Sequence, residues 1–332
     1  YSEKLSFENC KKNTRKKVEK CDIMYLRNKQ FREGNEMEKK YFESFDGLQI
    51  PYLLFESKRD DAKNNVIIFH GMTEPVTRYE EFGEFLAANG YNVYVMEIRG
   101  HGDLKDSEIG DFGKKGIKNV YSDVDMFLEH LSQYGVSSEN TVIFGHSMGS
   151  LMATKIGIEK DFKYFILSGW PVKPKIPVWS ASVVSFFEKL LFFRKKSTFN
   201  KIFIGYNKSF APNKSKVDWL TRDEMEAKKY EQDEFCGYAV SPKFFSGIFQ
   251  MMRIINRKYK QINKDSKILV VYGTEDRALN YGYINKLLKN LRKNKIKIGV
   301  LENKDGRHES LNEINKHKIY DEILEWLNSK DK

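Results

Sequence analysis

The chain has 332 residues, of which 40% are hydrophobic and 14% aromatic, and 57 Lys and Arg against 46 Asp and Glu give a formal net charge of +11. These proportions exclude a disordered or collagen-like chain. Three cysteines are too few for a disulfide scaffold, although Cys10 and Cys21 could bridge in an oxidising compartment. No apolar stretch reaches the length of a membrane-spanning helix. The positive charge indicates either a solvated lysine-rich surface or an anionic partner.

The first part of the chain, residues 1–40, is strongly charged and has lysines at helical spacing. We expect a helical extension that is mostly solvated. The chain begins with Tyr1 rather than Met, which indicates that an upstream stretch was removed. No signal sequence can be read. We therefore expect a cytoplasmic or membrane-peripheral protein and leave export open.

From residue 41 the pattern is that of alternating strands and helices. Asp46-Gly47 separates two alternating apolar runs, which is a strong hairpin signal. Six short apolar runs follow, and amphipathic stretches lie between them. Strands that are apolar on both faces belong inside a mostly parallel sheet with helices on both sides, so we predict an α/β fold. The runs are residues 66–69, 93–96, 141–144, 164–167, 268–272 and 296–300, and the helical stretches include 79–89, 119–134 and 283–294.

One block, residues 171–240, interrupts this alternation. It holds four prolines, aromatic pairs and charged helical segments, but no convincing central strand. We predict that it is a helical cap inserted between two parts of one core, residues 41–170 and 241–332.

The motif Gly145-His146-Ser147-Met148-Gly149 matches the nucleophile pattern G-x-S-x-G. The bare pattern is short, but a predicted strand precedes it and a helical stretch, residues 150–156, follows it, as the motif requires. The glycines let the two backbones pass closely, and the helix N-terminus favours an anion at the turn. We predict Ser147 as the nucleophile; the alternative is a structural glycine-rich turn.

A serine hydroxyl needs a general base, and the base needs an acid that orients it. In this fold the chain order is Ser, acid, His, so only His308 and His317 qualify as the base. His308 lies in a polar loop at the sheet edge where open α/β sheets place their sites, whereas His317 lies in a helical stretch. We predict His308.

The orienting acid should follow another strand, and Asp276 follows the run 268–272. Glu275 and Asp305 remain as competitors. We also expect Ser310 and Glu313 to form a capping box that starts the next helix.

The oxyanion of an acyl-transfer reaction needs two N–H donors. Met148 directly follows the nucleophile, and Met72 lies in the loop after the run 66–69, so their backbone amides are the predicted oxyanion hole. His70, His101 and His146 are expected to be structural, with His70 bracing its loop.

Together these segments resemble the monoacylglycerol lipase and lysophospholipase group of α/β-hydrolases, which overlaps with the serine aminopeptidase (S33) family. The resemblance covers about residues 40–330. It implies an α/β-hydrolase fold, a catalytic triad, a two-amide oxyanion hole, a cap between strands six and seven, and no metal or other cofactor. Glu97 departs from the Asp that the family usually has there. The segments are Phe69-His70-Gly71, Arg99-Gly100-His101-Gly102, Gly145–Ser150, Gly273–Asp276 and Arg307-His308-Glu309, and the implied site residues are Ser147, Asp276, His308, Met72 and Met148.

The cap carries much of the excess charge. Residues 171–216 contain ten Lys or Arg and one acid, Glu188, interleaved with nine aromatic residues. This composition suits contact with an anionic membrane, or a pocket for an acyl chain with a phosphate-bearing head group. The alternative is an aromatic cap core under a solvated basic face. No nucleic-acid-binding module is present in the sequence, so no nucleic-acid partner is expected.

We therefore predict a serine hydrolase that cleaves carboxylic esters of monoacyl lipids, either monoacylglycerols or lysophospholipids, through an acyl-enzyme on Ser147. The alternatives are another carboxylesterase, a thioesterase or a peptidase with the same triad, and a non-catalytic lipid-binding member.

Overall fold

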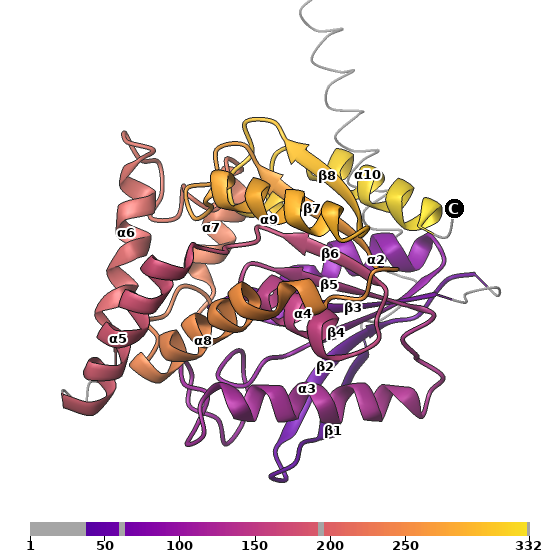
Figure 1. Ribbon diagram of the computed structural model, residues 1–332, viewed down its shortest axis with the longest axis horizontal. Helices are drawn as coiled ribbons and strands as arrows, with labels where there is room; N and C mark the ends of the chain where they lie inside the picture. The colour runs from indigo at the N-terminus through magenta and orange to yellow at the C-terminus, as the bar shows by residue number, and fades with distance from the viewer. Residues whose placement is uncertain (1–37, 60–63, 192–195, 331–332) are drawn as a thin grey trace, which may run out of the picture. The chain divides into compact units, whose positions relative to one another are not determined.

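The computed structural model describes residues 38–59, 64–191 and 196–330 (Figure 1). Lys39–Lys332 form one compact unit. The predicted extension, residues 1–40, lies outside the described residues except for its last three, which belong to a strand rather than a helix. Cys10 and Cys21 also lie outside them.

The described residues form an eight-stranded sheet in the order β1-β2-β4-β3-β5-β6-β7-β8. β2 pairs antiparallel with β4, and the strands from β4 through β3 to β8 are parallel to one another. The predicted mostly parallel sheet is confirmed. The strands are β1 (Glu38–Glu43), β2 (Gln49–Phe55), β3 (Asn64–Phe69), β4 (Tyr91–Met96), β5 (Thr141–His146), β6 (Tyr164–Ser168), β7 (Lys267–Gly273) and β8 (Lys297–Asn303).

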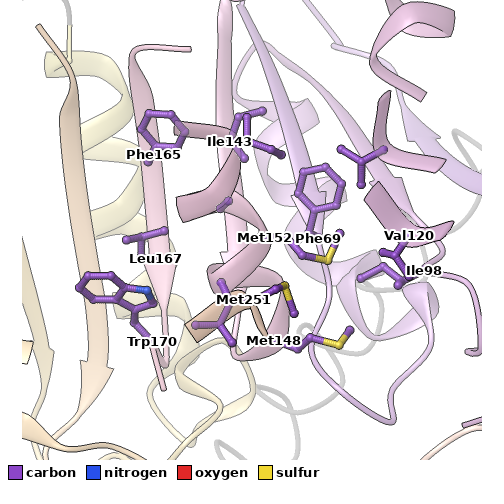
Figure 2. Packing of buried hydrophobic residues seen from close by; sticks show 14 of the residues in the cluster. Phe69, Ile98, Val120, Ile143, Met148, Met152, Phe165, Leu167, Trp170 and Met251 are labelled. Atoms are coloured by element: carbon purple, nitrogen blue, oxygen red, sulfur yellow. The ribbon is translucent and has the colours of Figure 1, made fainter. Parts of the chain in front are cut away.

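Alternate residues of a strand point to opposite faces of the sheet, and here both sets are apolar. Helices therefore cover both faces. In β3, Val66 and Ile68 are buried in the cluster that contains α2 and α10, whereas Ile67 and Phe69 are buried in the cluster that contains α3, α4, α8 and α9. Figure 2 shows part of the second cluster, where Met148 and Met152 of α4 lie near Met251 of α8. The helices are α2 (Glu80–Ala88), α3 (Ile117–Ser132), α4 (Met148–Glu159), α8 (Pro242–Lys258), α9 (Tyr281–Lys293) and α10 (Lys316–Ser329), with short 3₁₀ helices at Val76–Tyr79, Tyr259–Gln261 and Ser310–Asn312.

The predicted strands and helices are present, with shifted ends. The last predicted strand ends at residue 300, but β8 continues to Asn303 because its pairing with β7 extends to Gly273. This extension matters for the site, since it brings the following loop to the same sheet edge as the loop after β7.

The stretch 171–240, which we call the cap, forms α5 (Lys175–Leu191), α6 (Lys201–Lys208), α7 (Glu224–Gln232) and a 3₁₀ turn at Thr198–Asn200, with no strand among its described residues. The strands that flank it, β6 and β7, are neighbours in the sheet, so the insertion leaves the sheet continuous. In Figure 1, α5 and α6 lie with α8 at the left of the view. The division into a cap and a two-part core remains our proposal. Where the structure is described, none of the helices combines the length and apolar character needed to span a bilayer.

Candidate active site

Ser147 occupies a strained turn between β5 and α4. Its φ of 48° lies in the left-handed region, which a non-glycine residue adopts only when the surroundings enforce it. Strand and helix pass so closely that a Cβ on Gly149 would lie 1.9 Å from the Phe69 carbonyl oxygen, and one on Gly145 would lie 2.2 Å from the Gly149 oxygen. The glycines on both sides of Ser147 are therefore a steric requirement, as the sequence motif predicts.

Three side chains from three different strand ends form a continuous chain of polar contacts. His308 Nε2 lies 2.9 Å from Ser147 Oγ, and His308 Nδ1 lies 2.6 Å from Asp276 Oδ2. The other Asp276 oxygen accepts a hydrogen bond from the Ala278 N–H at 2.8 Å, which fixes the carboxylate. Asp276 is 1% exposed and His308 is 3% exposed. The structure thus brings together the three residues singled out in the sequence.

Two opposing effects determine the pKa of His308. Burial disfavours the imidazolium, but the Asp276 charge and hydrogen bond, helped by the charges of Glu309 and Glu74, outweigh burial and raise the pKa of His308. By contrast, burial lowers the pKa of His146 to about 4, although its ring is centred only 5.0 Å from that of His308. At neutral pH His146 is therefore a neutral neighbour of the site.

The competing acids and the competing base lie away from this chain. Glu275 pairs at the surface with Arg277 at 2.6 Å, and Asp305 is exposed in a turn with a positive φ. The His317 side chain is 76% exposed, 3.7 Å from Glu81. Among the described residues, no hydrogen bond or ion pair joins any of the three to Ser147 or His308.

The two predicted oxyanion donors line the same cavity as Ser147 and His308. Met148 is the first residue of α4, and Met72 lies in the turn after β3, where the preceding Gly71 N–H donates to Glu74 Oε1 at 2.5 Å. Neither the Met72 nor the Met148 N–H takes part in a loop or turn hydrogen bond of the described residues. That these two amides form the oxyanion hole remains our proposal.

His70 has the bracing role suggested by the sequence. It is fully buried, its Nε2 accepts a hydrogen bond from the Ile98 N–H at 3.0 Å, and its Nδ1 lies 2.7 Å from the Gly71 oxygen. Glu97 Oε1 lies 3.1 Å from His70 Nε2. His70 thereby ties the loop after β3 to the loop after β4.

Ser147 lies where two cavities meet. The first, about 290 Å³, is lined almost wholly by apolar side chains of α4, α5, α6 and α8. The second, about 520 Å³, is lined in part by the polar groups Glu74, Lys216, Tyr230 and Glu231. Both cavities include Met72, Ser147, Phe203, Trp219 and His308. A substrate with one apolar and one polar half can place its reacting bond at this junction.

Trp219 belongs to the site but was not identified from the sequence. Its ring stacks on His308, with centroids 5.1 Å apart, and on Phe203 of α6, with centroids 5.4 Å apart. Its carbonyl oxygen accepts the His308 N–H at 3.3 Å. No motif marks this tryptophan, because the contact depends on how the cap folds back over the loop of His308.

The predicted capping box at Ser310 and Glu313 is wrong. Ser310 begins a 3₁₀ turn, and α10 starts only at Lys316 after Asn315. The buried Glu313 carboxylate instead accepts the Arg307 N–H at 2.8 Å and pairs with Arg222 of the cap at 2.9 Å. Glu313 therefore anchors the loop of His308 to the cap.

The sequence left two alternatives for the aromatic residues of the cap, an aromatic cap core or a surface for lipid. The structure contains both half-buried and exposed aromatic side chains. Four are half-buried: one packs against rings of α8, and the other three pack around Trp219 or against Arg307 and form a cap core. Three are exposed on α5, and two lie outside the described residues. The half-buried set is Phe199, Phe203, Tyr206 and Phe210, the exposed set is Trp179, Phe186 and Phe187, and the remaining pair is Phe192 and Phe193.

Comparison with known proteins identifies the family of this chain. The family model described as serine aminopeptidase, S33, matches residues 60–315. The chain belongs to this family. A monoacylglycerol lipase of Mycolicibacterium smegmatis is 22% identical over 297 residues, which cover 86% of this chain and 95% of the relative.

Solved structures share the fold of this S33 family member. A thermostable carboxyl esterase from Bacillus coagulans, solved in complex with glycerol, superposes with a TM-score of 0.74 at 21% identity, covering 89% of this chain and 97% of that chain. A monoacylglycerol lipase from Paleococcus ferrophilus gives a TM-score of 0.64 at 20% identity, covering 84% and 98%. The chain thus has the α/β-hydrolase fold of a hydrolase family, as the sequence predicts.

Proposed function

We propose that this S33 family member is a serine hydrolase that cleaves the carboxylic ester of monoacyl lipids through an acyl-enzyme on Ser147. The observation that carries the proposal is the contact chain from half-buried Ser147 to buried His308 and Asp276, at the junction of an apolar and a polar cavity. The names of the lipase and esterase relatives support the same reaction class.

The proposed mechanism follows from the positions of the groups. Ser147 Oγ attacks the ester carbonyl carbon while His308 Nε2 takes the hydroxyl proton, and Asp276 stabilises the imidazolium that forms. The Met72 and Met148 amides receive the negative charge that develops on the carbonyl oxygen. His308 then gives its proton to the alcohol oxygen as the ester C–O bond breaks. Water attacks the acyl-enzyme by the same steps and releases the fatty acid.

The substrate class is inferred from the two cavities. A single acyl chain fits the apolar cavity between α5, α6 and α8, where its burial is favourable, and a polar head group fits the more polar cavity. Monoacylglycerols and lysophospholipids share this division into one chain and one head. Thioesters, simple esters and peptides would use the same triad and are the alternatives to test.

A series of substrates tests this assignment. Hydrolysis rates are compared for monoacylglycerols of increasing chain length, a lysophosphatidylcholine, an acyl-CoA thioester and an aminoacyl anilide, with Ser147→Ala as the blank. We expect kcat/KM to rise with acyl length for the monoacyl esters and to exceed that for the anilide. Faster cleavage of the anilide, or equal rates for short and long acyl chains, would contradict a monoacyl lipid substrate.

We further propose that the outer face of α5 contacts an anionic membrane. Its exposed residues include Ile176, Trp179, Phe186, Phe187 and Leu190, and Trp179 is 64% exposed. The spacing of these residues places them on one side of the helix, while Val178 and Ser185 on the other side are buried. Inner-side residues of the same helix line the apolar cavity, so an acyl chain would have a short path from the membrane.

Basic residues lie on α5 and in the segment that follows it in the chain. Lys175 and Lys189 of α5 are exposed, as are Lys196, Lys201 and Lys208 nearby in the chain, whereas the acid of the region, Glu188, is buried. Each lysine close to an anionic surface contributes about 1 kcal/mol, and the aromatic rings suit the interfacial layer. The charge complementarity therefore favours anionic over neutral lipid.

Co-sedimentation with vesicles tests this contact. The triple variant Trp179→Ser, Phe186→Ser and Phe187→Ser should bind anionic vesicles more weakly than wild type, and wild-type binding should weaken with salt. A matched control replaces three exposed apolar residues elsewhere, Tyr134, Met225 and Ile314, with Ser. Equal loss of binding in both triple variants, or wild-type binding that is independent of salt, would refute the proposal.

A further inference from the structure

Three segments of the site meet around one buried arginine, Arg78. Its Nε donates to Glu74 Oε2 at 3.2 Å, and its Nη2 pairs with Glu309. The guanidinium also lies over the Tyr230 ring of α7, 4.9 Å from the ring centroid. Arg78 thus touches the turn after β3, the loop of His308 and the cap.

These charges are almost completely removed from water. The Arg78 side chain is 8% exposed, and those of Glu74 and Glu309 are each 4% exposed. Burying an ion pair carries a large desolvation penalty, so such a network is weak evidence for stability by itself. Its directional contacts nevertheless fix geometry, because a planar guanidinium can hold two carboxylates in one arrangement.

The two carboxylates sit next to the groups that would react. Glu74 Oε1 accepts the N–H of Gly71, which directly precedes Met72, and it also accepts the Tyr79 hydroxyl at 2.9 Å. Glu309 directly follows His308, and its own N–H donates to the Leu220 oxygen of the cap at 2.8 Å. Arg78 therefore connects the neighbour of the proposed oxyanion donor with the neighbour of the proposed base.

We propose that Arg78 is a positioning residue, which sets the Met72 amide relative to Ser147 and His308 by holding Glu74, Glu309 and the cap together. This inference rests on the proposed function. Arg78 does not itself touch the reacting atoms. Its loss should impair transition-state stabilisation more than substrate binding, because a displacement of about 1 Å can cost on the order of 100-fold in rate.

The experiment compares Arg78→Met and Arg78→Lys with a matched control, Arg99→Met. Arg99 is also 8% exposed, binds two carboxylates, Asp46 and Asp123, and lies over an aromatic ring. Its two carboxylates line neither cavity, whereas the partners of Arg78, Glu74 and Glu309, both line the polar cavity. Each variant is assayed for kcat and KM on a soluble short-chain ester and for thermal unfolding. Affinity is measured for an alkyl trifluoromethyl ketone, which forms a tetrahedral adduct with serine, and for the matching alcohol, which cannot.

We expect Arg78→Met to lower kcat about 10- to 100-fold while KM changes less than about 2-fold. The affinity for the ketone should fall by a similar factor, and the affinity for the alcohol should stay at the wild-type value. Arg78→Lys should retain part of kcat, because lysine keeps the positive charge but lacks the planar guanidinium that can bind two carboxylates in a fixed arrangement. Arg99→Met should lower the melting temperature and leave kcat within about 2-fold. If Arg78→Met does not fold, the lysine variant carries the test, with an expected loss of about 10-fold in kcat.

The proposal is overturned if folded Arg78 variants keep the wild-type ratio of ketone to alcohol affinity, or if Arg99→Met loses kcat to the same extent. Failure of the proposed function would give a different result, seen in the wild-type protein. In that case wild type itself would neither hydrolyse the ester nor react with the ketone.

Discussion

Replacing Asp276 with Asn tests the contact chain at its most buried member. The substitution keeps the size of the side chain but removes the charge that lies 2.6 Å from His308 Nδ1. The new amide can also donate a hydrogen bond to Nδ1, which favours the imidazole tautomer that cannot accept the Ser147 proton at Nε2. Both effects lower kcat, and the fold should change little because the volume is conserved.

The size of the effect follows from the electrostatics. Unit charges about 4 Å apart attract by about 4 kcal/mol at an effective dielectric constant near 20. Because about 1.4 kcal/mol corresponds to tenfold in rate, loss of this stabilisation of the imidazolium accounts for roughly three orders of magnitude. The unfavourable tautomer adds to this loss, so we expect kcat to fall by about 10³ to 10⁴.

The pH profile gives a second, independent readout. In wild type the acid limb of kcat/KM reports the raised pKa of His308, and activity falls as pH drops through that value. In Asp276→Asn the main charge that favours the imidazolium is gone, although Glu309 and Glu74 still favour it. The pKa of His308 should therefore be lower than in wild type, and the residual acid limb should move to lower pH.

The assay is steady-state hydrolysis of a soluble ester from about pH 4 to 9, with Glu275→Gln as the control. Glu275 is adjacent in sequence but pairs with Arg277 at the surface, so its substitution should leave kcat within about 2-fold. If Asp276→Asn kept more than a tenth of wild-type kcat, or if Glu275→Gln lost more, the identification of the acid would be refuted.

Two further predictions concern the base and the turn of the nucleophile. His308→Ala should reduce kcat by several orders of magnitude while the exposed His317→Ala stays at the wild-type rate, and the reverse result in the same assay would exclude His308 as the base. Gly149→Ala should prevent folding or strongly destabilise the protein in thermal unfolding, since its Cβ would lie 1.9 Å from a backbone oxygen. The control is Gly205→Ala in α6, where an added Cβ meets no atom within 4 Å; it should raise the free energy of unfolding by about 0.5–1 kcal/mol. Unchanged stability of Gly149→Ala would contradict the steric argument.

The fold could be predicted from the sequence because its determinants are local. Runs such as Val66–Phe69 are apolar on both faces, which is the requirement for a strand with helices on both sides, and they indeed form β3 between two buried clusters. The position of Ser147 was equally accessible, since the flanking glycines, the strand and the helix are contiguous in the chain. Chain order then reduced the base to two histidines, and the structure brings His308 to Ser147.

The remaining features of the site depend on contacts between distant segments. Trp219 stacks on His308 only because residues 218–222 of the cap run beside residues 307–313, and no periodicity encodes that pairing. Glu74 and Arg78 offered a partial signal, since they are four residues apart in the loop that also holds Met72, but their partner Glu309 is far away in sequence. The capping-box prediction failed for the same reason, because a distant arginine, Arg222, competes for Glu313.

The most direct test of the proposed reaction is to trap the acyl-enzyme and locate it. The protein is mixed with an activated acyl ester, quenched in acid within the first turnover and digested, and the acylated peptide is sequenced by mass spectrometry. We predict one acyl group per chain, attached to Ser147, that forms in a burst and disappears at the rate of steady-state turnover. Continued hydrolysis in Ser147→Ala, or a stable acyl group on any other residue, would contradict the account.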